Sequence, residues 1–370
     1  MSQNTGDAVP QAVRRGQRCL RRAPARGAQD GRALTLGLLL WLWAAVAPAQ
    51  TSTLGIEYAQ VDGVSLRLDL FRPADAPAPG APVGLWVHGG GWCSGARAPL
   101  PDYASGLVAQ GFAVAAASYR LTSTTPNCAN AAGVDWPLPL HDLKAAVRWL
   151  RANSAALALD PARIGVWGQS AGGHLALALA YTAGQSAYEG TVGSHLGVSS
   201  EVQAVLAYFP PSELIELGPD FARTPPGRPD LVAAVEGPGQ PHAHLIGFGA
   251  AGEGMGLIRQ NLANPEAPWP ARVAAARSAS PLHALGPAAP PTYLLHGAAD
   301  LVVPVQQSRR LAGALAASGV PHQYVEIAGL GHVPPSAAES AAARLWIAGV
   351  LRSAVFADGF EAPAPASLPR

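Results

Sequence analysis

The pentapeptide Gly168-Gln169-Ser170-Ala171-Gly172 lies directly between a predicted strand at residues 163–167 and a predicted helix at residues 171–181. A serine on such a turn is held in a strained backbone conformation that lifts its hydroxyl clear of the sheet. The flanking glycines let the strand and the helix approach closely, and the positive end of the helix points at the hydroxyl. The pattern alone occurs by chance, but its place between a strand and a helix makes it specific. We therefore predict that Ser170 is a nucleophile in an α/β fold.

Strands and helices alternate along most of the chain, which favours a mostly parallel sheet with helices on both faces. The sequence begins this pattern with a hairpin, in which Asp62-Gly63 is a strong turn signal and adds antiparallel strands at one edge. Residues 210–289 contain no clear strand and are rich in glycine and proline, so we predict an irregular insertion or lid before the Asp-bearing strand. The predicted strands cover residues 56–61, 65–71, 83–87, 112–118, 163–167, 202–209, 292–296 and 323–327, and the predicted helices cover residues 102–110, 140–153, 171–181, 306–318 and 337–353.

A second glycine run, His88-Gly89-Gly90-Gly91-Trp92, follows the predicted strand at residues 83–87. Glycines leave the backbone uncovered, so Gly89, Gly90 and Gly91 can present N–H groups to one point. Together with the N–H of Ala171 they would form an oxyanion hole, in which one donor typically contributes about 3–4 kcal/mol to transition-state stabilisation. The alternative is a glycine turn whose donors point at nothing, and the serine turn nearby disfavours it.

A serine nucleophile needs a base, and the base needs a carboxylate that orients it. In this architecture both follow the serine, with the acid first. Asp300 comes four residues after the strand that ends at His296, and His332 follows the last predicted strand. Because the carboxyl ends of parallel strands meet at one edge of the sheet, we predict Ser170, Asp300 and His332 as a catalytic triad.

Three other residues compete for these roles or support them. Glu326 is an alternative acid, but it lies within its strand and too early to reach the rim. His296 is an alternative base, but it precedes a glycine turn and is expected to be structural. We expect His88 to brace the glycine loop rather than to act on substrate.

Three further histidines and one tryptophan carry weaker signals. His174 lies one turn into the nucleophile helix and is expected to be a packed polar residue. His242 and His244 could be metal ligands, but two histidines without nearby carboxylates or cysteines are usually ordinary loop residues, so we predict no metal. Trp92 is a candidate for lining the substrate pocket, and the alternative is an aromatic residue that roofs the core.

The composition and the distribution of charge bear on which macromolecules the protein can bind. Apolar residues make up 49% of the chain, which is enough for a large core, and charged residues only 13%. Residues 1–49 carry seven arginines and two aspartates, so the remainder is slightly acidic and has Lys144 as its single lysine. No basic stripe is left to hold a phosphate backbone, and we therefore expect no nucleic-acid partner.

The first 49 residues have the order of a secretory signal peptide. Residues 33–46 read ALTLGLLLWLWAAV, which is short of the roughly 20 apolar residues that span a bilayer. Arginines precede this run, and Ala47-Pro48-Ala49 follows it. We predict a signal peptide with a basic N-terminal extension at 1–49, a catalytic domain at 50–355 and a flexible tail at 356–370. The mature protein is then secreted or periplasmic without a stable membrane span, and the alternative is an uncleaved anchor.

Cleavage after Ala49 would remove Cys19 and leave Cys93 and Cys128 in an oxidising compartment. Both follow predicted strand ends at the edge of the sheet where ligands bind. We predict that they form a disulfide, and the alternative is two unpaired small core residues.

Taken in order, the runs HGGGW, SYRL at residues 118–121, GQSAGG, HGAADLVVP and GH resemble the α/β-hydrolase superfamily. The chain is most similar to carboxylesterases that carry HGGG, the hormone-sensitive-lipase-like group. Its stretches HDLKAAVRWLRANSAALALDPARIGVWGQSAGGHLALALA and SASPLHAL resemble bacterial feruloyl and acetyl-xylan esterases. The resemblance covers roughly residues 56–355 and lacks the long helical N-terminal cap of many relatives. It implies ester hydrolysis through an acyl-enzyme without a cofactor, with the triad and oxyanion residues named above.

Three functions remain under consideration. The first is an exported serine esterase that acts on short-chain or aromatic esters, including feruloyl and acetyl groups linked to polysaccharide. The second is a serine peptidase of the prolyl-oligopeptidase type, which the HGGG run disfavours. The third is a non-catalytic binding module on the same fold, which a full set of triad residues disfavours.

Overall fold

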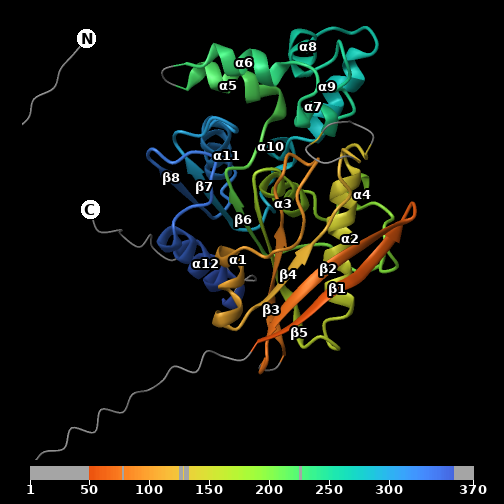
Figure 1. The fold of residues 1–370 in the computed structure, drawn as a ribbon, viewed down its shortest axis with the longest axis vertical. Helices are drawn as coiled ribbons and strands as arrows, with labels where there is room; N and C mark the ends of the chain where they lie inside the picture. Colours follow the sequence, from red (N-terminus) through yellow and green to blue (C-terminus); the bar gives the residue numbers. More distant parts are fainter. Residues whose placement is uncertain (1–49, 77–78, 125–127, 129–132, 225–226, 354–370) are drawn as a thin grey trace, which may run out of the picture. The chain divides into compact units, whose positions relative to one another are not determined.

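The computed structural model describes residues 50–76, 79–124, 128, 133–224 and 227–353 (Figure 1). The predicted signal peptide at 1–49 and the predicted tail at 356–370 lie outside the described residues. Among the helices of the described part, none is both long enough and apolar enough to cross a membrane.

The described residues form a single eight-stranded sheet in the order β1-β2-β4-β3-β5-β6-β7-β8 (Figure 1). All neighbours from β4 to β8 pair in parallel, whereas β1 pairs with β2 and β2 with β4 in the antiparallel sense. The Asp62-Gly63 turn has φ of 51° and 76°, as the predicted tight hairpin requires. The strands are β1 Gln50–Val61, β2 Val64–Pro73, β3 Ala81–Val87, β4 Ala113–Ala117, β5 Leu159–Gln169, β6 Ala204–Tyr208, β7 Thr292–Gly297 and β8 His322–Ile327.

Helices cover both faces of the sheet, as predicted. On one face α12 packs against β5, β6 and β7, and α1 packs against α12; on the other face α2, α3 and α11 pack against the strands (Figure 1). The helices of the main fold are α1 Asp102–Ser105, α2 Leu138–Ala152, α3 Ala171–Tyr181, α4 Ser186–Glu189, α11 Gln306–Ala317 and α12 Ala337–Arg352, together with the 3₁₀ helix η1 Val108–Gln110.

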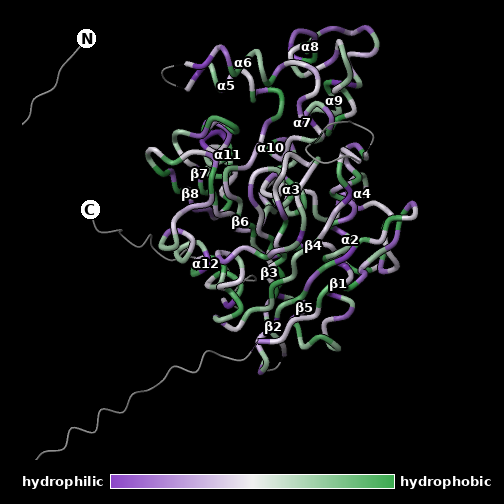
Figure 2. Tube along the Cα trace, in the orientation of Figure 1, coloured by the Kyte–Doolittle hydropathy of each residue, from purple (hydrophilic) through white to green (hydrophobic). Residues whose placement is uncertain are grey.

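The central strands and α3 are buried on all sides. Every residue of β3, β4, β6 and α3 is buried, which explains their near-continuous apolar sequences. Figure 2 shows the same stretches coloured mainly hydrophobic, whereas the helices after β6 alternate between polar and apolar residues. Helix α12 begins at a capping box, in which Ser336 and Glu339 bond each other's backbone N–H groups.

Strands β1 and β5 begin at Gln50 and Leu159, earlier than the predicted starts at residues 56 and 163, and α4 was not predicted. Two further expectations about secondary structure differ more from the structure. The predicted helix at residues 102–110 is divided into α1 and η1 at Gly106, where a Cβ would lie 2.9 Å from Arg344 Nε. Residues 210–289, which we call the cap segment, were expected to be irregular but are mostly helical. Short helices are only marginally stable in isolation, and frequent glycine and proline obscure their periodicity. Their formation therefore depends on packing against the rest of the protein. They are η3 Leu214–Glu216, α5 Leu217–Arg223, α6 Pro229–Glu236, α7 Pro241–Leu245, α8 Met255–Gln260, α9 Trp269–Ser278 and α10 Pro281–Ala284.

Candidate active site

Ser170 occupies the turn between β5 and α3 with φ of 53° and ψ of −125°. This left-handed φ is strained for a serine. Two glycines make the turn possible, because a Cβ at Gly168 would lie 2.2 Å from the Gly172 carbonyl oxygen. A Cβ at Gly172 would lie 2.2 Å from the Val87 carbonyl oxygen. A larger residue at either position would force β3, β5 and α3 apart, so this turn requires glycine at both positions.

The structure brings together the three residues predicted as a triad. His332 Nε2 lies 3.0 Å from Ser170 Oγ, and His332 Nδ1 lies 2.7 Å from Asp300 Oδ2. Their sequence positions are 162 and 32 residues apart, respectively. A carboxylate can only accept, so the Nδ1–H of the neutral imidazole donates to Asp300. The lone pair on Nε2 then faces the serine hydroxyl, which is the geometry of a general base.

Asp300 is held as a carboxylate. It is 2% exposed, and its Oδ1 accepts the backbone N–H groups of Val302 and Val303 at 2.8 and 2.9 Å. Burial by itself would raise the pKa of Asp300, but hydrogen bonds from His296 and His332 lower that pKa overall to well below its ordinary value. The charge therefore persists beside His332 across the whole physiological range.

The glycine run after β3 lies next to the serine turn. A Cβ at Gly89 would be 3.4 Å from the Ser170 Cβ, and Gly90 and Gly91 have φ of 113° and 59°, which favour glycine. Ala171 is the first residue of α3, so its N–H has no partner within the helix. Of the four residues predicted as oxyanion donors, Gly89 and Ala171 therefore lie beside Ser170, and Gly90 and Gly91 follow Gly89 in the same run.

His88 braces this run from below, as expected. Its Nδ1 lies 2.8 Å from the Gly89 carbonyl oxygen, and its ring stacks on Tyr119 with centroids 4.3 Å apart. Tyr119 donates its hydroxyl to the His88 carbonyl oxygen at 3.0 Å. Burial lowers the pKa of His88 to about 4, partly opposed by its bond to Gly89, so the imidazole stays neutral.

The alternative acid and base lie elsewhere or act indirectly. Glu326 is paired with Arg309 and Tyr324 on the outer side of the sheet edge. His296 is fully buried; its Nε2 lies 2.9 Å from the Val303 carbonyl oxygen and 3.4 Å from Asp300 Oδ2. It supports the Asp300 turn from behind.

Trp92 is 3% exposed, so little of it is available to line an open pocket. Its indole N–H donates to His174 Nδ1 at 3.0 Å, which fits the alternative of a residue that packs over the core. Next to it, Cys93 forms a disulfide with Cys128, with Cα atoms 5.0 Å apart. The bridge ties the end of the glycine run to the loop after β4.

His242 and His244 lie on α7 and are buried. Within the described residues, no group of three or more histidines, cysteines, aspartates or glutamates is arranged to hold a metal ion. Pro241, the first residue of the same helix, would lie 3.1 Å from a Cβ at Gly91. The cap segment therefore contacts the glycine run through α7.

Two neighbours of the site, Phe209 and Tyr103, were not predicted from the sequence. Phe209 follows β6, and its ring lies 4.5 Å from the His332 ring, where it backs the imidazole. Tyr103 on α1 donates to Gln169 Oε1 at 2.6 Å and so holds the residue before Ser170 in place. A signal was available for Phe209, since it follows a strand whose carboxyl end faces the serine, whereas Tyr103 comes from a distant helix.

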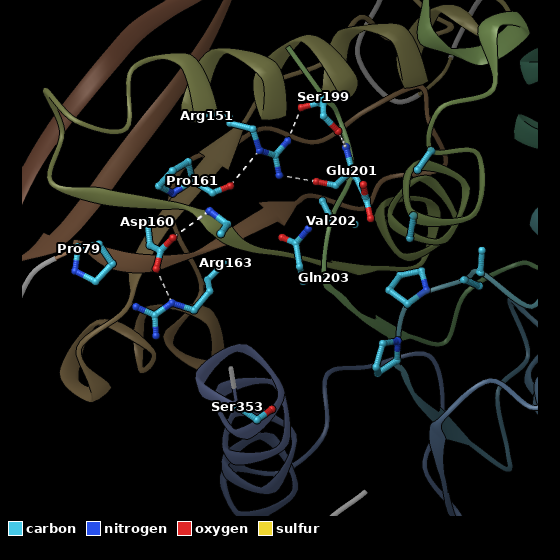
Figure 3. Close-up of a pocket in the computed structure, with 17 residues that line it drawn as sticks. Pro79, Arg151, Asp160, Pro161, Arg163, Ser199, Glu201, Val202, Gln203 and Ser353 are labelled. Atoms are coloured by element: carbon cyan, nitrogen blue, oxygen red, sulfur yellow. Dashed lines mark hydrogen bonds and ion pairs between the residues drawn. The ribbon is translucent and has the colours of Figure 1, made fainter. Parts of the chain in front are cut away.

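A cavity of about 900 Å³ lies at the amino ends of the strands, away from Ser170 (Figure 3). Its walls include residues just before β6 and β7 and the start of β5, whereas Ser170 and Asp300 follow the carboxyl ends of β5 and β7. Three of its charged side chains already have partners: Arg163 pairs with Asp160, and Arg151 donates to the carbonyl oxygens of Pro161 and Glu201. Ligands of such sheets bind at the carboxyl ends, so we assign the chemistry to the serine site.

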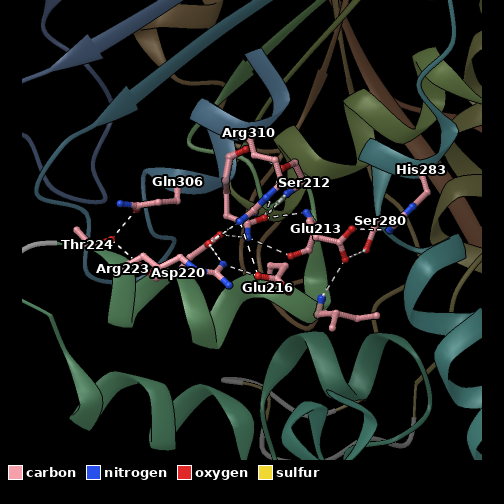
Figure 4. A network of polar contacts seen from close by, with 12 residues as sticks. Ser212, Glu213, Glu216, Asp220, Arg223, Thr224, Ser280, His283, Gln306 and Arg310 are labelled. Atoms are coloured by element: carbon pink, nitrogen blue, oxygen red, sulfur yellow. Dashed lines mark hydrogen bonds and ion pairs between the residues drawn. The ribbon is translucent and has the colours of Figure 1, made fainter. Parts of the chain in front are cut away.

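The cap segment is anchored to the main fold by a polar network around Asp220 and Glu213 (Figure 4). Arg310 on α11 makes a bidentate pair with Asp220 at 2.8 and 2.6 Å. Gln307 on the same helix donates to Asp220 Oδ2 and accepts the backbone N–H groups of Ser212 and Glu213. These contacts join η3 and α5 to the helix that follows the Asp300 turn.

Comparison with known proteins places these features in a family context. Residues 68–232 match the family model described as BD-FAE, and residues 260–351 match that of the prolyl oligopeptidase family. Esterase LipC of Mycobacterium tuberculosis is 30% identical over 269 residues, which cover 72% of this chain and 56% of that protein. The chain thus spans about half the length of this curated relative.

Solved structures share the architecture. A truncated carbohydrate esterase from gut microbiota superposes with a TM-score of 0.65 at 23% identity, over 83% of this chain and 98% of the other. Esterase 2 of Thermogutta terrifontis, solved with propionate bound, gives a TM-score of 0.54 at 25% identity, over 78% of this chain and 86% of that one. The predicted fold class is therefore confirmed.

Proposed function

We propose that this chain, which belongs to the α/β-hydrolase superfamily, is a serine carboxylesterase of the group that carries a His-Gly-Gly-Gly run. The observation that carries the proposal is the chain of contacts from Asp300 through His332 to Ser170, at 2.7 and 3.0 Å. The names of its relatives support the same activity, since LipC and the Thermogutta enzyme are both called esterases.

The geometry supports a two-step mechanism. Ser170 Oγ attacks the ester carbonyl carbon while His332 Nε2 takes its proton and then passes it to the leaving alcohol. Asp300 holds the imidazole in the required tautomer and stabilises the imidazolium. Backbone N–H groups of the glycine run and of Ala171 stabilise the oxyanion. Water then attacks the acyl-enzyme with His332 as base, which releases the acid and restores Ser170.

We infer that the acyl group is small or aromatic, as in acetyl and feruloyl esters. Support comes from the Thermogutta esterase, which holds a propionate, and from the carbohydrate esterase among the structural neighbours. A carbohydrate esterase acts on esters of carbohydrates. An exported enzyme would meet such esters, as acyl groups on polysaccharides, outside the cell.

The test is a substrate panel with purified protein that begins at Gln50. It comprises p-nitrophenyl acetate and butyrate, methyl ferulate, acetylated xylan and a proline-containing peptide anilide. We expect ester hydrolysis, and we expect Ser170→Ala to lower kcat by about 10⁵-fold, as in other serine triads. The exposed serine of α4 gives a matched control, since Ser186→Ala should leave kcat unchanged.

One observation favours a second function. The match to the prolyl oligopeptidase family covers residues 260–351, which contain both Asp300 and His332. Cleavage of the peptide anilide in the absence of ester hydrolysis would therefore establish a peptidase and overturn the esterase proposal.

A further inference from the structure

His174 lies on α3, one turn after Ser170, and is fully buried. Its backbone N–H donates to the Ser170 carbonyl oxygen at 2.9 Å, so the imidazole is tied to the same helical turn as the nucleophile. Both ring nitrogens have partners: Nδ1 lies 3.0 Å from Trp92 Nε1, and Nε2 lies 2.6 Å from the Ala279 carbonyl oxygen. The ring thus joins the glycine run and the cap segment to the nucleophile helix.

The partners fix the protonation state of this imidazole. An indole N–H can only donate, so Nδ1 must be the acceptor, and a carbonyl oxygen can only accept, so Nε2 must carry the hydrogen. A protonated His174 would set two donors against each other at Trp92. Burial lowers the pKa of His174 to about 4, with the bond to Ala279 opposing it, which agrees with a ring that is neutral at physiological pH.

Trp92 needs such a partner because its backbone is strained. It has φ of 60°, and a positive φ is rare for a bulky residue and costs roughly 1–3 kcal/mol. Strain of this kind persists only where the surroundings hold it. The bond to His174 and the edge-on contact of the two rings, with centroids 5.0 Å apart, are contacts of this kind.

We propose that His174 is a positioning residue that fixes the oxyanion loop, defined as residues 88–93, through the hydrogen bond from Trp92. Trp92 is the residue directly after Gly91, so its place sets where the N–H groups of the glycine run point. The anchor at Ala279, after α9, gives the ring its own orientation. This role rests on the proposed esterase function, and it assigns to a histidine outside the triad the task of aligning donors with Ser170.

The first test is Trp92→Phe, which keeps an aromatic ring and removes the N–H donor. The Cys93 disulfide and the bond from Thr122 N–H to the Trp92 carbonyl oxygen still hold the loop. We therefore expect a fall in kcat for p-nitrophenyl acetate on the order of tenfold, less than for a lost oxyanion donor, with KM within about twofold.

Trp136→Phe is the matched control. Trp136 contacts the same imidazole, with ring centroids 5.8 Å apart, and donates its indole N–H to Ser278 Oγ at 3.1 Å. It lies outside the oxyanion loop. Its substitution should lower the thermal midpoint comparably but leave kcat within about twofold, because the loss of one buried hydrogen bond is similar in the two variants.

A second pair of variants separates hydrogen bonding from packing. Gln at position 174 offers one acceptor and one donor, as the neutral imidazole does, whereas Leu offers neither. We expect His174→Gln to keep kcat within about threefold of the wild type and His174→Leu to lower it by on the order of tenfold. Equal losses in the two variants would show that volume matters and not the paired hydrogen bonds.

A readout that does not require esterase activity completes the design. Hydrogen exchange of the peptide that contains residues 88–93, followed by mass spectrometry, should be faster in Trp92→Phe and His174→Leu than in Trp136→Phe. Unchanged exchange in all variants would overturn the positioning role whatever the enzyme hydrolyses. Faster exchange in a protein that hydrolyses no ester would retain the loop anchor and reject the esterase function instead.

Discussion

At the scale of single residues, the candidate site depends as much on absent side chains as on reactive ones. Gly168 and Gly172 leave the space in which Ser170 adopts its left-handed conformation. Both carboxylate oxygens of Asp300 have partners. Oδ1 accepts two backbone N–H groups, and Oδ2 lies next to two histidines. These contacts hold the side chains of the candidate site in defined orientations, which is what the proposed esterase mechanism requires.

Asp300→Asn tests the role of this carboxylate. An amide can present its NH₂ group to His332 and favour the wrong tautomer, so we expect kcat to fall by about 10⁴-fold with the fold retained. Steady-state kinetics on p-nitrophenyl acetate, with circular dichroism as the check on folding, would measure this. A fall of less than tenfold would remove Asp300 from the mechanism.

The same variant also tests how the free energy of unfolding depends on pH. The pKa of Asp300 is lowered in the folded protein, so its charge stabilises the fold fully above the unfolded carboxyl value of about 3.9. That contribution is lost as the pH falls below this value towards the folded pKa. The difference in unfolding free energy between wild type and Asp300→Asn should therefore shrink below pH 4. Asp230→Asn, at an exposed ion pair with Arg228, is the control and should show little difference at any pH.

At the scale of elements, loops after strand ends are held by contacts that the strands do not supply. The Cys93–Cys128 disulfide joins the glycine run to the loop after β4 across 35 residues of sequence. Arg120, just after β4, makes a buried pair with Asp142 on α2 at 2.8 Å. These contacts hold the glycine run, the predicted oxyanion loop, to the main fold.

Loss of the disulfide should affect both stability and turnover. The chain-entropy estimate for a loop of this length is about 4 kcal/mol, and measured values are often smaller. We expect the double variant Cys93→Ser/Cys128→Ser to unfold at a lower temperature and to have a lower kcat, because the oxyanion loop loses one anchor. Peptide mapping of native protein without reductant should recover the linked peptides, whereas two free thiols would contradict the pairing.

The anchor of the cap segment can be tested at Arg310. Replacing one partner of a buried ion pair costs about 3–5 kcal/mol, but Asp220 keeps Gln307 and Arg223 as donors. We therefore expect Arg310→Met to lower the unfolding free energy in urea by about 1–3 kcal/mol. The neighbouring Arg309→Met breaks an exposed pair with Glu326 and should cost at most about 1 kcal/mol. Equal effects would show that the network does not hold the cap segment.

At the scale of the whole molecule, one sheet brings distant segments to a common edge. Ser170 and Asp300 follow β5 and β7, and His332 follows β8, so strands that are neighbours in the sheet deliver residues far apart in the sequence. The hydrogen bonds between the loops after β7 and β8, such as Ala299 N–H to the Leu330 carbonyl oxygen, hold the acid and the base in register.

The predicted signal peptide at residues 1–49 can be tested by expressing the whole given sequence. Expressed with residues 1–49 in a bacterium that exports proteins, the chain should be cleaved after Ala49 and accumulate outside the cytoplasm. Intact mass and N-terminal sequencing of the exported fraction would identify Gln50 as the new terminus. A full-length product that sediments with membranes would instead support an uncleaved anchor.

The sequence by itself determined those features whose causes are local or periodic. Alternating apolar runs predict the strands and helices of the main fold, and glycines at fixed offsets from Ser170 predict the nucleophile turn. The positions of Asp300 and His332 follow from strand ends, because parallel strands deliver their following loops to one edge. The Asp62-Gly63 hairpin was predictable for the same local reason.

Only the tertiary structure decided the features that depend on partners distant in sequence. The cap segment is helical because its short elements pack on one another and on α11. Its glycines and prolines interrupt the sequence too often for a helical periodicity to be recognised. Trp92 packs inward because His174, 82 residues away, offers the acceptor that its indole needs. Tyr103 reaches the site in the same way, since its contact with Gln169 joins two segments that are distant in sequence and is not specified by local sequence.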